Sequence, residues 1–177
     1  MNLPNLITLL RIAAVPFTVW LILEGQLVVA FWLFVAAGVS DALDGFIAKR
    51  FNMETELGKY LDPLADKLLL VSIYVTMGME GYIVNWLVIL VVFRDIFIVG
   101  GALLFETVTH ALTVQPLMVS KVNTTVQIVF AAAVMASVGY AIELGEWVVD
   151  VLVLATAATT IASGVTYAVE WVRRWTQ

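Results

Sequence analysis

Residues 40–70 read SDALDGFIAKRFNMETELGKYLDPLADKLLL, and this stretch decides the fold class. It places Asp41, Asp44, Asp62 and Asp66 inside or beside runs that are otherwise apolar enough to span a bilayer. An ionised side chain at membrane depth costs about 2.5–3.5 kcal/mol on insertion scales, so these acids need cations, water or each other. Helical periodicity places the first two on one face of a helix and the last two on one face of a second helix. Two acidic faces on neighbouring helices predict a cation site.

The composition is that of a polytopic membrane protein. Of the 177 residues, 62% are hydrophobic and 13% are charged, and the mean hydropathy is +1.00. The absence of cysteine excludes disulfides, thiolate metal sites and a cysteine nucleophile. The formal net charge of −5 is a poor guide to partners, because most acids belong to the central cluster or to loops. We expect no nucleic-acid partner.

Six apolar stretches predict an all-α fold with six transmembrane helices, in one domain over residues 1–177. A helix of about 20 residues crosses the roughly 30 Å hydrocarbon core. The predicted spans are residues 3–23, 27–48, 58–77, 83–105, 117–138 and 147–171. We expect Pro16 to kink the first span. Six spans place both termini on the same side of the membrane.

Basic residues predict which side faces the cytoplasm. The connections after the first, third and fifth spans contain no Lys or Arg, and they carry the acids Glu24, Glu80, Glu143 and Glu146. The opposite side carries Lys49, Arg50, Lys59, Arg173 and Arg174. By the positive-inside rule, both termini and the acidic cluster are cytoplasmic. We expect a multi-pass protein of a bacterial cytoplasmic membrane, without a cleavable signal before the first span.

Arg11 is a candidate phosphate contact in the first span. Asn5, Thr8 and Arg11 recur at helical spacing, so they face one direction near the start of that span. The alternative for Arg11 is an interfacial anchor whose stem is buried and whose charge reaches the membrane surface. The aligned Asn5 and Thr8 favour the phosphate contact.

The acidic faces also suit a metal-dependent reaction at phosphorus. Carboxylate oxygens are ligands that Mg²⁺ or Mn²⁺ prefer, and such ions neutralise charge on reacting phosphates. Gly45 and Ala48 leave room on the acidic face for an extended ligand, although small residues also serve helix packing. Arg94 and Lys121 add positive charge suited to a second phosphate group, and the alternative is that they pair with Asp95 or with the central aspartates.

The spacing of the acidic stretch is specific. The run Asp41-Ala42-Leu43-Asp44-Gly45, followed by Ala48, Gly58, Asp62 and Asp66, fits the pattern DxxDGxxAR(x8)GxxxDxxxD. In this it resembles the CDP-alcohol phosphatidyltransferases. Lys49 stands where the family has arginine, which keeps the charge but loses the planar bidentate geometry, and the neighbouring Arg50 is the candidate to replace that arginine. The segment NLPNLITLLRI is similar to the first helix of phosphatidylglycerophosphate and cardiolipin synthases, and FRDIFIVGGA and SKVNTTVQ resemble the cardiolipin synthases.

The resemblance implies transfer of a phosphatidyl group from CDP-diacylglycerol to an alcohol, with release of CMP, by a homodimer. It implies two ions, Mg²⁺ or Mn²⁺, held by Asp41, Asp44, Asp62 and Asp66, with Asp66 also acting as the general base for the acceptor hydroxyl. The predicted nucleotide contacts are Asn5, Thr8, Asp41, Gly45, Ala48, Lys49 and Asp62. The predicted phosphate or acceptor contacts are Arg11, Arg50, Arg94 and Lys121.

Two acceptors and one different class of function stay open. We expect phosphatidylglycerol as the acceptor, giving cardiolipin, and glycerol-3-phosphate is the alternative. Acids and bases inside the membrane also suit a cation transporter. A transporter needs polar residues toward both faces, whereas here the charged residues crowd one side and the outer halves of the spans are nearly all apolar.

Overall fold

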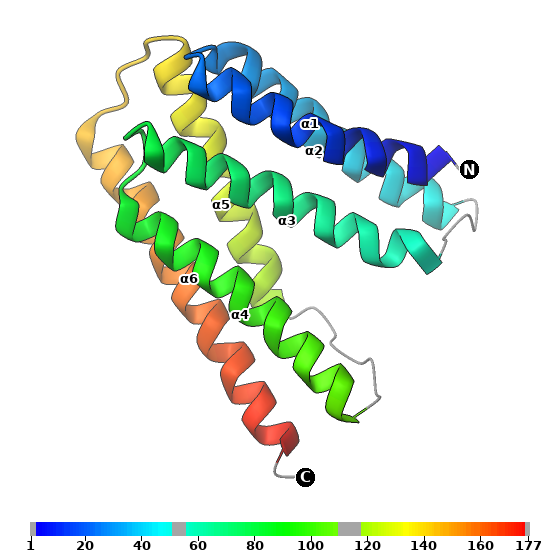
Figure 1. Cartoon of the computed structure of the whole chain (residues 1–177). Helices are drawn as coiled ribbons and strands as arrows, with labels where there is room; N and C mark the ends of the chain where they lie inside the picture. The colour runs from blue at the N-terminus through cyan, green and yellow to red at the C-terminus, as the bar shows by residue number, and fades with distance from the viewer. Residues whose placement is uncertain (1–2, 51–55, 110–117, 176–177) are drawn as a thin grey trace. The chain divides into compact units, whose positions relative to one another are not determined.

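The described chain is all-helical, as predicted. The structure is a computed structural model that describes the backbone of residues 3–50, 56–109 and 118–175 and the side chains of residues 7–41, 64–102 and 118–173. Its helices are α1 (Leu3–Leu23), α2 (Leu27–Arg50), α3 (Glu56–Met79), α4 (Asn85–Thr109), α5 (Met118–Gly139) and α6 (Glu146–Trp175) (Figure 1). α1 runs unbroken through Pro16, where a kink is predicted.

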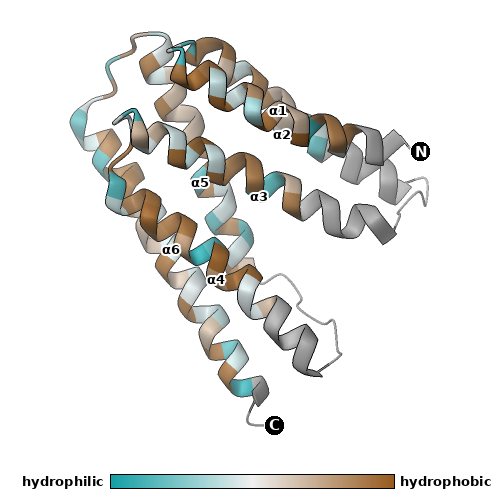
Figure 2. Cartoon of the chain, viewed as in Figure 1, coloured by the Kyte–Doolittle hydropathy of each residue, from teal (hydrophilic) through white to brown (hydrophobic). Residues whose placement is uncertain are grey.

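Three helical segments are long and apolar enough to cross a membrane, judged over the described residues. They are Asn85–Ala102, Met118–Gly139 and Glu146–Arg173. The segments Ile7–Leu23 and Leu27–Asp41 are apolar but shorter. Many of the described residues along the helices are hydrophobic (Figure 2). The predicted number of six spans and the predicted side of the termini remain predictions.

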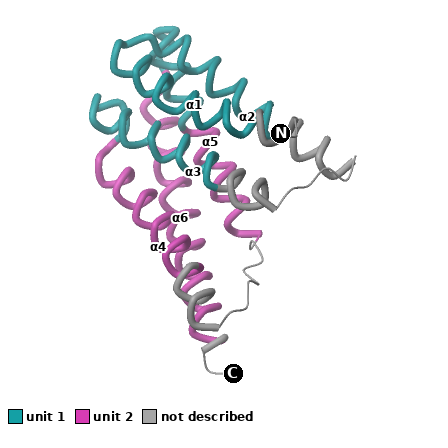
Figure 3. Tube along the Cα trace, turned by 45° about the vertical axis from the view of Figure 1, so that its right-hand side comes forward, with its two compact units in different colours: residues 1–83, 131–143 teal, residues 84–130, 144–177 magenta. Residues whose placement is uncertain are grey.

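The helices form two compact units (Figure 3). Unit 1 comprises Met1–Ile83 and Ala131–Glu143, and unit 2 comprises Val84–Phe130 and Leu144–Gln177. Unit 1 therefore contains α1, α2 and α3, and unit 2 contains α4 and α6. α5 contributes its first part to unit 2 and its last part to unit 1.

In unit 1, α1 packs against both α2 and α3. Its helices carry large side chains that are completely buried, including Ile22, Ile73 and Tyr74. The end of α5 approaches the start of α2 so closely that a Cβ on Gly139 would lie 2.9 Å from the backbone nitrogen of Val28. This close approach ties the last part of α5 to unit 1.

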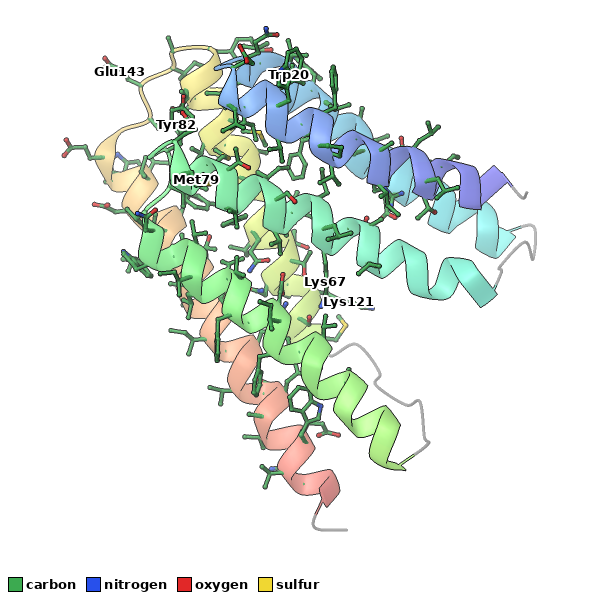
Figure 4. All side chains as sticks on the ribbon, viewed as in Figure 1. Trp20, Lys67, Met79, Tyr82, Lys121 and Glu143 are labelled. Carbon is green, nitrogen blue, oxygen red and sulfur yellow. The ribbon has the colours of Figure 1, made fainter. Side chains whose placement is uncertain are left out.

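The same backbone motif ends α1, α3 and α5. A residue with positive φ follows each helix: Gly25 at 71°, Gly81 at 77° and Ala141 at 52°. Its N–H donates to the carbonyl three residues back, at 3.0, 3.1 and 3.3 Å, and the next N–H donates to the carbonyl five residues back, at 2.8, 2.8 and 2.9 Å. These paired bonds define the Schellman motif, which satisfies carbonyls at a helix end. Tyr82 and Glu143 lie in the connections at this end of unit 1 (Figure 4).

In unit 2, α4 packs against α6. Trp171 of α6 covers Gly101 of α4, and a Cβ at Gly101 would overlap the indole ring. The ring centroid of Trp171 lies 5.0 Å from that of Phe97 and 6.2 Å from that of Tyr167. Because aromatic neighbours hold the indole in place, this contact requires a residue without a side chain at position 101.

Candidate functional site

Two of the four predicted metal ligands meet at one arginine in unit 1. Nη1 of Arg11 on α1 donates to Oδ1 of Asp41 on α2 at 2.6 Å and to Oδ1 of Asp66 on α3 at 2.8 Å. Because both carboxylate oxygens contact the same nitrogen, they lie within a few ångström of each other. The acidic faces of α2 and α3 are therefore brought together at these two positions, as their helical spacing predicts.

Burial differs sharply across this cluster. Arg11 is 4% exposed, whereas the side chains of Asp41 and Asp66 are 40% and 45% exposed. The guanidinium thus lies inside unit 1 and is not extended to a surface as an interfacial anchor would be. Burial of this charge is compensated by two anionic partners. The carboxylates keep an open side on which a ligand can bind.

The pair of carboxylates fits a divalent cation. Their oxygens already converge on one positive nitrogen, and carboxylate oxygens are the donors that hard divalent ions prefer. Among the side chains that the structure describes, no group of three or more acidic, histidine or cysteine residues is gathered for a metal ion. The remaining predicted ligands, Asp44 and Asp62, lie outside those side chains.

Other predicted contacts fall partly outside the described residues. The side chains at Asn5, Gly45, Ala48, Lys49 and Arg50 are among those that the structure does not describe, although their backbones belong to α1 and α2. Thr8, one turn before Arg11, is 1% exposed and lies within the packed interior. Their predicted roles at the nucleotide and the phosphates remain predictions.

Arg94 is the centre of a buried polar cluster in unit 2. On α4, Arg94 and Asp95 are 4% and 5% exposed. Nη1 of Arg94 donates to Oδ1 of Asp95 at 2.6 Å, and Nη2 donates to Oγ of Ser120 on α5 at 2.6 Å. Oγ of Ser163 on α6 accepts from Nε at 3.2 Å and also from Nη2. The guanidinium therefore joins all three helices that contribute to unit 2.

These bonds limit what Arg94 can offer to a ligand. A guanidinium has five N–H groups, and the described contacts use four of them, leaving one on Nη1. The pairing with Asp95, one of the two sequence interpretations, is present. Lys121 is exposed on α5 (Figure 4) and makes no ion pair with another described residue. It is the more accessible of the two cations.

A second polar group between α5 and α6 is not predicted by the sequence analysis. Nε2 of Gln127 donates to Oγ1 of Thr160 at 3.3 Å, and Oγ1 of Thr160 donates to Oδ1 of Asn123 at 2.9 Å. All three side chains are at most 1% exposed. The signal was available in the spacing, because Ser120, Asn123 and Gln127 recur on one face of α5.

Comparison with known proteins gives the same family as the motif. Residues 1–169 match the CDP-alcohol phosphatidyltransferase family. The chain is 35% identical to "CDP-diacylglycerol--glycerol-3-phosphate 3-phosphatidyltransferase 1, chloroplastic" of Oryza sativa, over 97% of this chain and 57% of the relative. It is 32% identical to human "Cardiolipin synthase (CMP-forming)", over 94% of this chain and 60% of the relative. The chain thus spans less than two thirds of the length of these relatives.

A shorter relative is covered more fully. The "CDP-diacylglycerol--glycerol-3-phosphate 3-phosphatidyltransferase" of Bacillus subtilis is 32% identical, over 76% of each chain. The family match also includes the acidic stretch of α2 and α3, from which Asp41 and Asp66 converge on Arg11. By sequence over almost its whole length, the chain belongs to the CDP-alcohol phosphatidyltransferase family.

Proposed function

We propose that the chain transfers a phosphatidyl group from CDP-diacylglycerol to an anionic alcohol and releases CMP. The observation that carries the proposal is the convergence of Asp41 and Asp66 on Nη1 of Arg11. Acids from two helices, both belonging to the family motif, share one cationic contact there. Family membership supports the choice of reaction.

In the proposed reaction, the acceptor hydroxyl oxygen forms a bond to the phosphorus that carries diacylglycerol. The bond between that phosphorus and the bridging oxygen of CMP breaks, and CMP leaves with the bonding electrons. Asp66 takes the hydroxyl proton as the general base. Its side chain is 45% exposed, so an acceptor can reach it. Direct displacement needs no covalent enzyme intermediate, which suits a chain without cysteine.

Divalent ions are part of the proposal. Enzymes of this family generally use a divalent metal, and we assign two ions, Mg²⁺ or Mn²⁺, to Asp41, Asp44, Asp62 and Asp66. When bound, the ions would neutralise charge on the phosphate oxygens. The convergence of two of these carboxylates on Arg11 supports the assignment, because their oxygens lie close enough together to share one cation.

The remaining ligand contacts are proposed partly from the family motif and partly from helical spacing and charge. We assign the cytidine nucleotide to α1 and α2, at Asn5, Thr8, Gly45, Ala48 and Lys49, together with Asp41 and Asp62. Phosphate contacts are assigned to Arg11, Arg50, Arg94 and Lys121. For Arg94, one N–H remains beyond its described hydrogen bonds. Lys121 is exposed and is therefore the stronger candidate of the two for the acceptor phosphate.

Two acceptors fit this chemistry. Phosphatidylglycerol, which would give cardiolipin, is supported by the segment SKVNTTVQ and by the relatives named as cardiolipin synthases. Glycerol-3-phosphate is supported by the Oryza and Bacillus relatives, which are named for that acceptor. Both acceptors carry a phosphate group that a cation would bind.

We further propose that the protein is a multi-pass homodimer in a bacterial cytoplasmic membrane, with its site facing the cytoplasm. Three described segments of sufficient length and apolarity support the membrane location. Light scattering of the purified protein in detergent would give its mass, and a mass of one chain would contradict the homodimer.

The function is tested by supplying purified protein with CDP-diacylglycerol and each acceptor separately, and measuring CMP and the lipid product. We expect CMP release that requires both an acceptor and Mg²⁺ or Mn²⁺, and that stops with a chelator. Cardiolipin from phosphatidylglycerol would support the first acceptor, and product from glycerol-3-phosphate alone would replace it with the second. Metal-dependent cation flux in vesicles without any CMP release would favour the transporter instead.

A further inference from the structure

Two polar layers lie next to each other in unit 2. Ser120 and Asn123 are three residues apart on α5, and Thr160 and Ser163 are three residues apart on α6. Arg94 joins the two serines, and a hydrogen bond joins Thr160 to Asn123. Because one helical turn rises about 5.4 Å, the two layers are neighbours along the same helix pair.

The layer formed by Asn123, Gln127 and Thr160 has hydrogen bonds that run in one direction and orient the Asn123 amide. A threonine hydroxyl has a single proton to donate. Oγ1 of Thr160 accepts from Nε2 of Gln127 at 3.3 Å and gives its own proton to Oδ1 of Asn123 at 2.9 Å. In this arrangement the oxygen of the asparagine amide faces Thr160. Its Nδ2, with two N–H groups, is left for another partner.

That partner is absent from the described part of the protein. Asn123 is 0% exposed, and its Nδ2 makes no hydrogen bond with any described residue. A buried donor without an acceptor costs free energy that a bound oxygen atom would recover. The chain of hydrogen bonds thus ends in a donor that is available to an acceptor atom of a bound ligand.

We propose that Asn123 is a substrate-binding residue whose Nδ2 donates to a phosphate oxygen of the acceptor alcohol. The proposal rests on the proposed function, and the phosphate can belong to a lipid headgroup or to a soluble molecule. Arg94, in the neighbouring layer, has one N–H beyond its described hydrogen bonds, and Asn123 adds neutral donors whose direction is fixed. Thr160 and Gln127 are positioning residues, because they act on the ligand only through the amide.

The test compares Asn123→Asp with Asn123→Leu. The acceptor concentration is varied at saturating CDP-diacylglycerol, with glycerol-3-phosphate and phosphatidylglycerol in separate arms, and CMP release is measured. We expect Asn123→Leu to raise the KM for the acceptor about tenfold, since one charge-assisted hydrogen bond is lost. Asn123→Asp raises it further, because a carboxylate repels the phosphate. The KM for CDP-diacylglycerol stays unchanged in both variants.

A purely structural role gives a different pattern. Because Asn123 is buried, both variants would then raise the KM for CDP-diacylglycerol and lower the thermal midpoint along with raising the KM for the acceptor, and this result would overturn the proposal. Thr125→Val is the matched control, since its exposed hydroxyl donates only to the carbonyl of Lys121, at 2.9 Å. We expect this variant to keep both KM values.

For variants with too little CMP release to measure, acceptor binding is followed by thermal unfolding in detergent, with and without each acceptor. The wild-type protein should be stabilised by its acceptor, and Asn123→Asp should lose this stabilisation. Whichever acceptor stabilises the wild-type protein, glycerol-3-phosphate or phosphatidylglycerol, is the molecule that supplies the phosphate. Absence of CMP release from the wild type in both arms would refute the proposed function alone, whereas absence of a thermal shift in both arms would also refute the role of Asn123.

Discussion

Asp66 is the residue on which the proposed chemistry depends most. On α3 it accepts a hydrogen bond from Arg11 and remains 45% exposed. Asp66→Asn keeps the shape of the side chain but removes its ability to take a proton. We expect CMP release to fall about 10²–10⁴-fold, the usual contribution of a general base. Asp150→Asn, the same change at an exposed position of α6, should leave the rate unchanged. Equal rates in the two variants would exclude Asp66 as the base.

Arg94 should matter for stability as well as for binding. Arg94→Met leaves the buried carboxylate of Asp95 and the hydroxyls of Ser120 and Ser163 without their shared donor. Removing one partner of a buried ion pair costs about 3–5 kcal/mol. Arg94→Lys restores charge but not the planar fork, so it should recover only part of the loss.

The measurement for Arg94 is unfolding of the protein in mixed detergent micelles. Arg173→Lys is the control for Arg94→Lys. It makes the same replacement at an exposed position in the last turn of α6, where no guanidinium is buried, and it should unfold like the wild type. Wild-type stability in Arg94→Met would show that the polar cluster does not hold α4, α5 and α6 together.

At the residue scale, the convergence of two acids was easier to predict than the partners of the basic residues. Helical spacing places Asp41 on the acidic face of one helix and Asp66 on the acidic face of another, and the structure joins them at Arg11. The identity of that shared partner, and the two serines around Arg94, depend on which helices pack together. Such contacts between distant segments leave little trace in local spacing, so they could not be predicted.

Helices were the most predictable elements, because runs of more than about 17 apolar residues are typical of membrane-spanning helices. The predicted first span and α1 share the same bounds, residues 3–23. α2 and α3 reach further into the acidic stretch than predicted, to Arg50 and from Glu56. Hydropathy undercounts helix length there because charged residues end the apolar run before the backbone leaves the helical conformation.

The α4–α6 contact gives a prediction at the scale of elements. Gly101→Ala places a methyl group where Trp171 packs, and overpacking of this kind costs about 1–3 kcal/mol. Gly100→Ala, the adjacent residue of the same helix, meets nothing within 4 Å and should be neutral or slightly stabilising. Thermal unfolding of the two variants in one detergent compares them directly. Equal unfolding temperatures would contradict the packing described for Trp171.

At the scale of the whole molecule, the membrane orientation rests on charge distribution alone and can be tested with introduced thiols. The chain has no cysteine, so each label reports one position. We expect Glu143→Cys to react with an impermeant maleimide in intact cells. Arg173→Cys should react only after the membrane is permeabilised, as the positive-inside rule requires. The reverse pattern would place the acidic cluster on the outer side of the membrane.

The family was predictable because the motif has fixed spacing, whereas the acceptor was not. Some relatives are named as glycerol-3-phosphate phosphatidyltransferases and others as cardiolipin synthases, although both kinds align with most of this chain. Discrimination between two phosphate-bearing alcohols depends on which side chains of different helices come together. This is a property of packing, and one sequence does not encode it in a local pattern.

The turn after α5 offers a way to make the protein more robust for biochemical work. Gly25 and Gly81 hold the left-handed position that closes α1 and α3, but the equivalent place after α5 is occupied by Ala141, whose methyl group disfavours this conformation. Ala141→Gly should raise the free energy of unfolding by about 0.5–1 kcal/mol, after allowing for the greater freedom of glycine in the unfolded chain. A lower thermal midpoint would count against this account. Such a variant would withstand purification better than the wild type. The substitution relaxes one strained backbone position that is distant in sequence from the proposed general base.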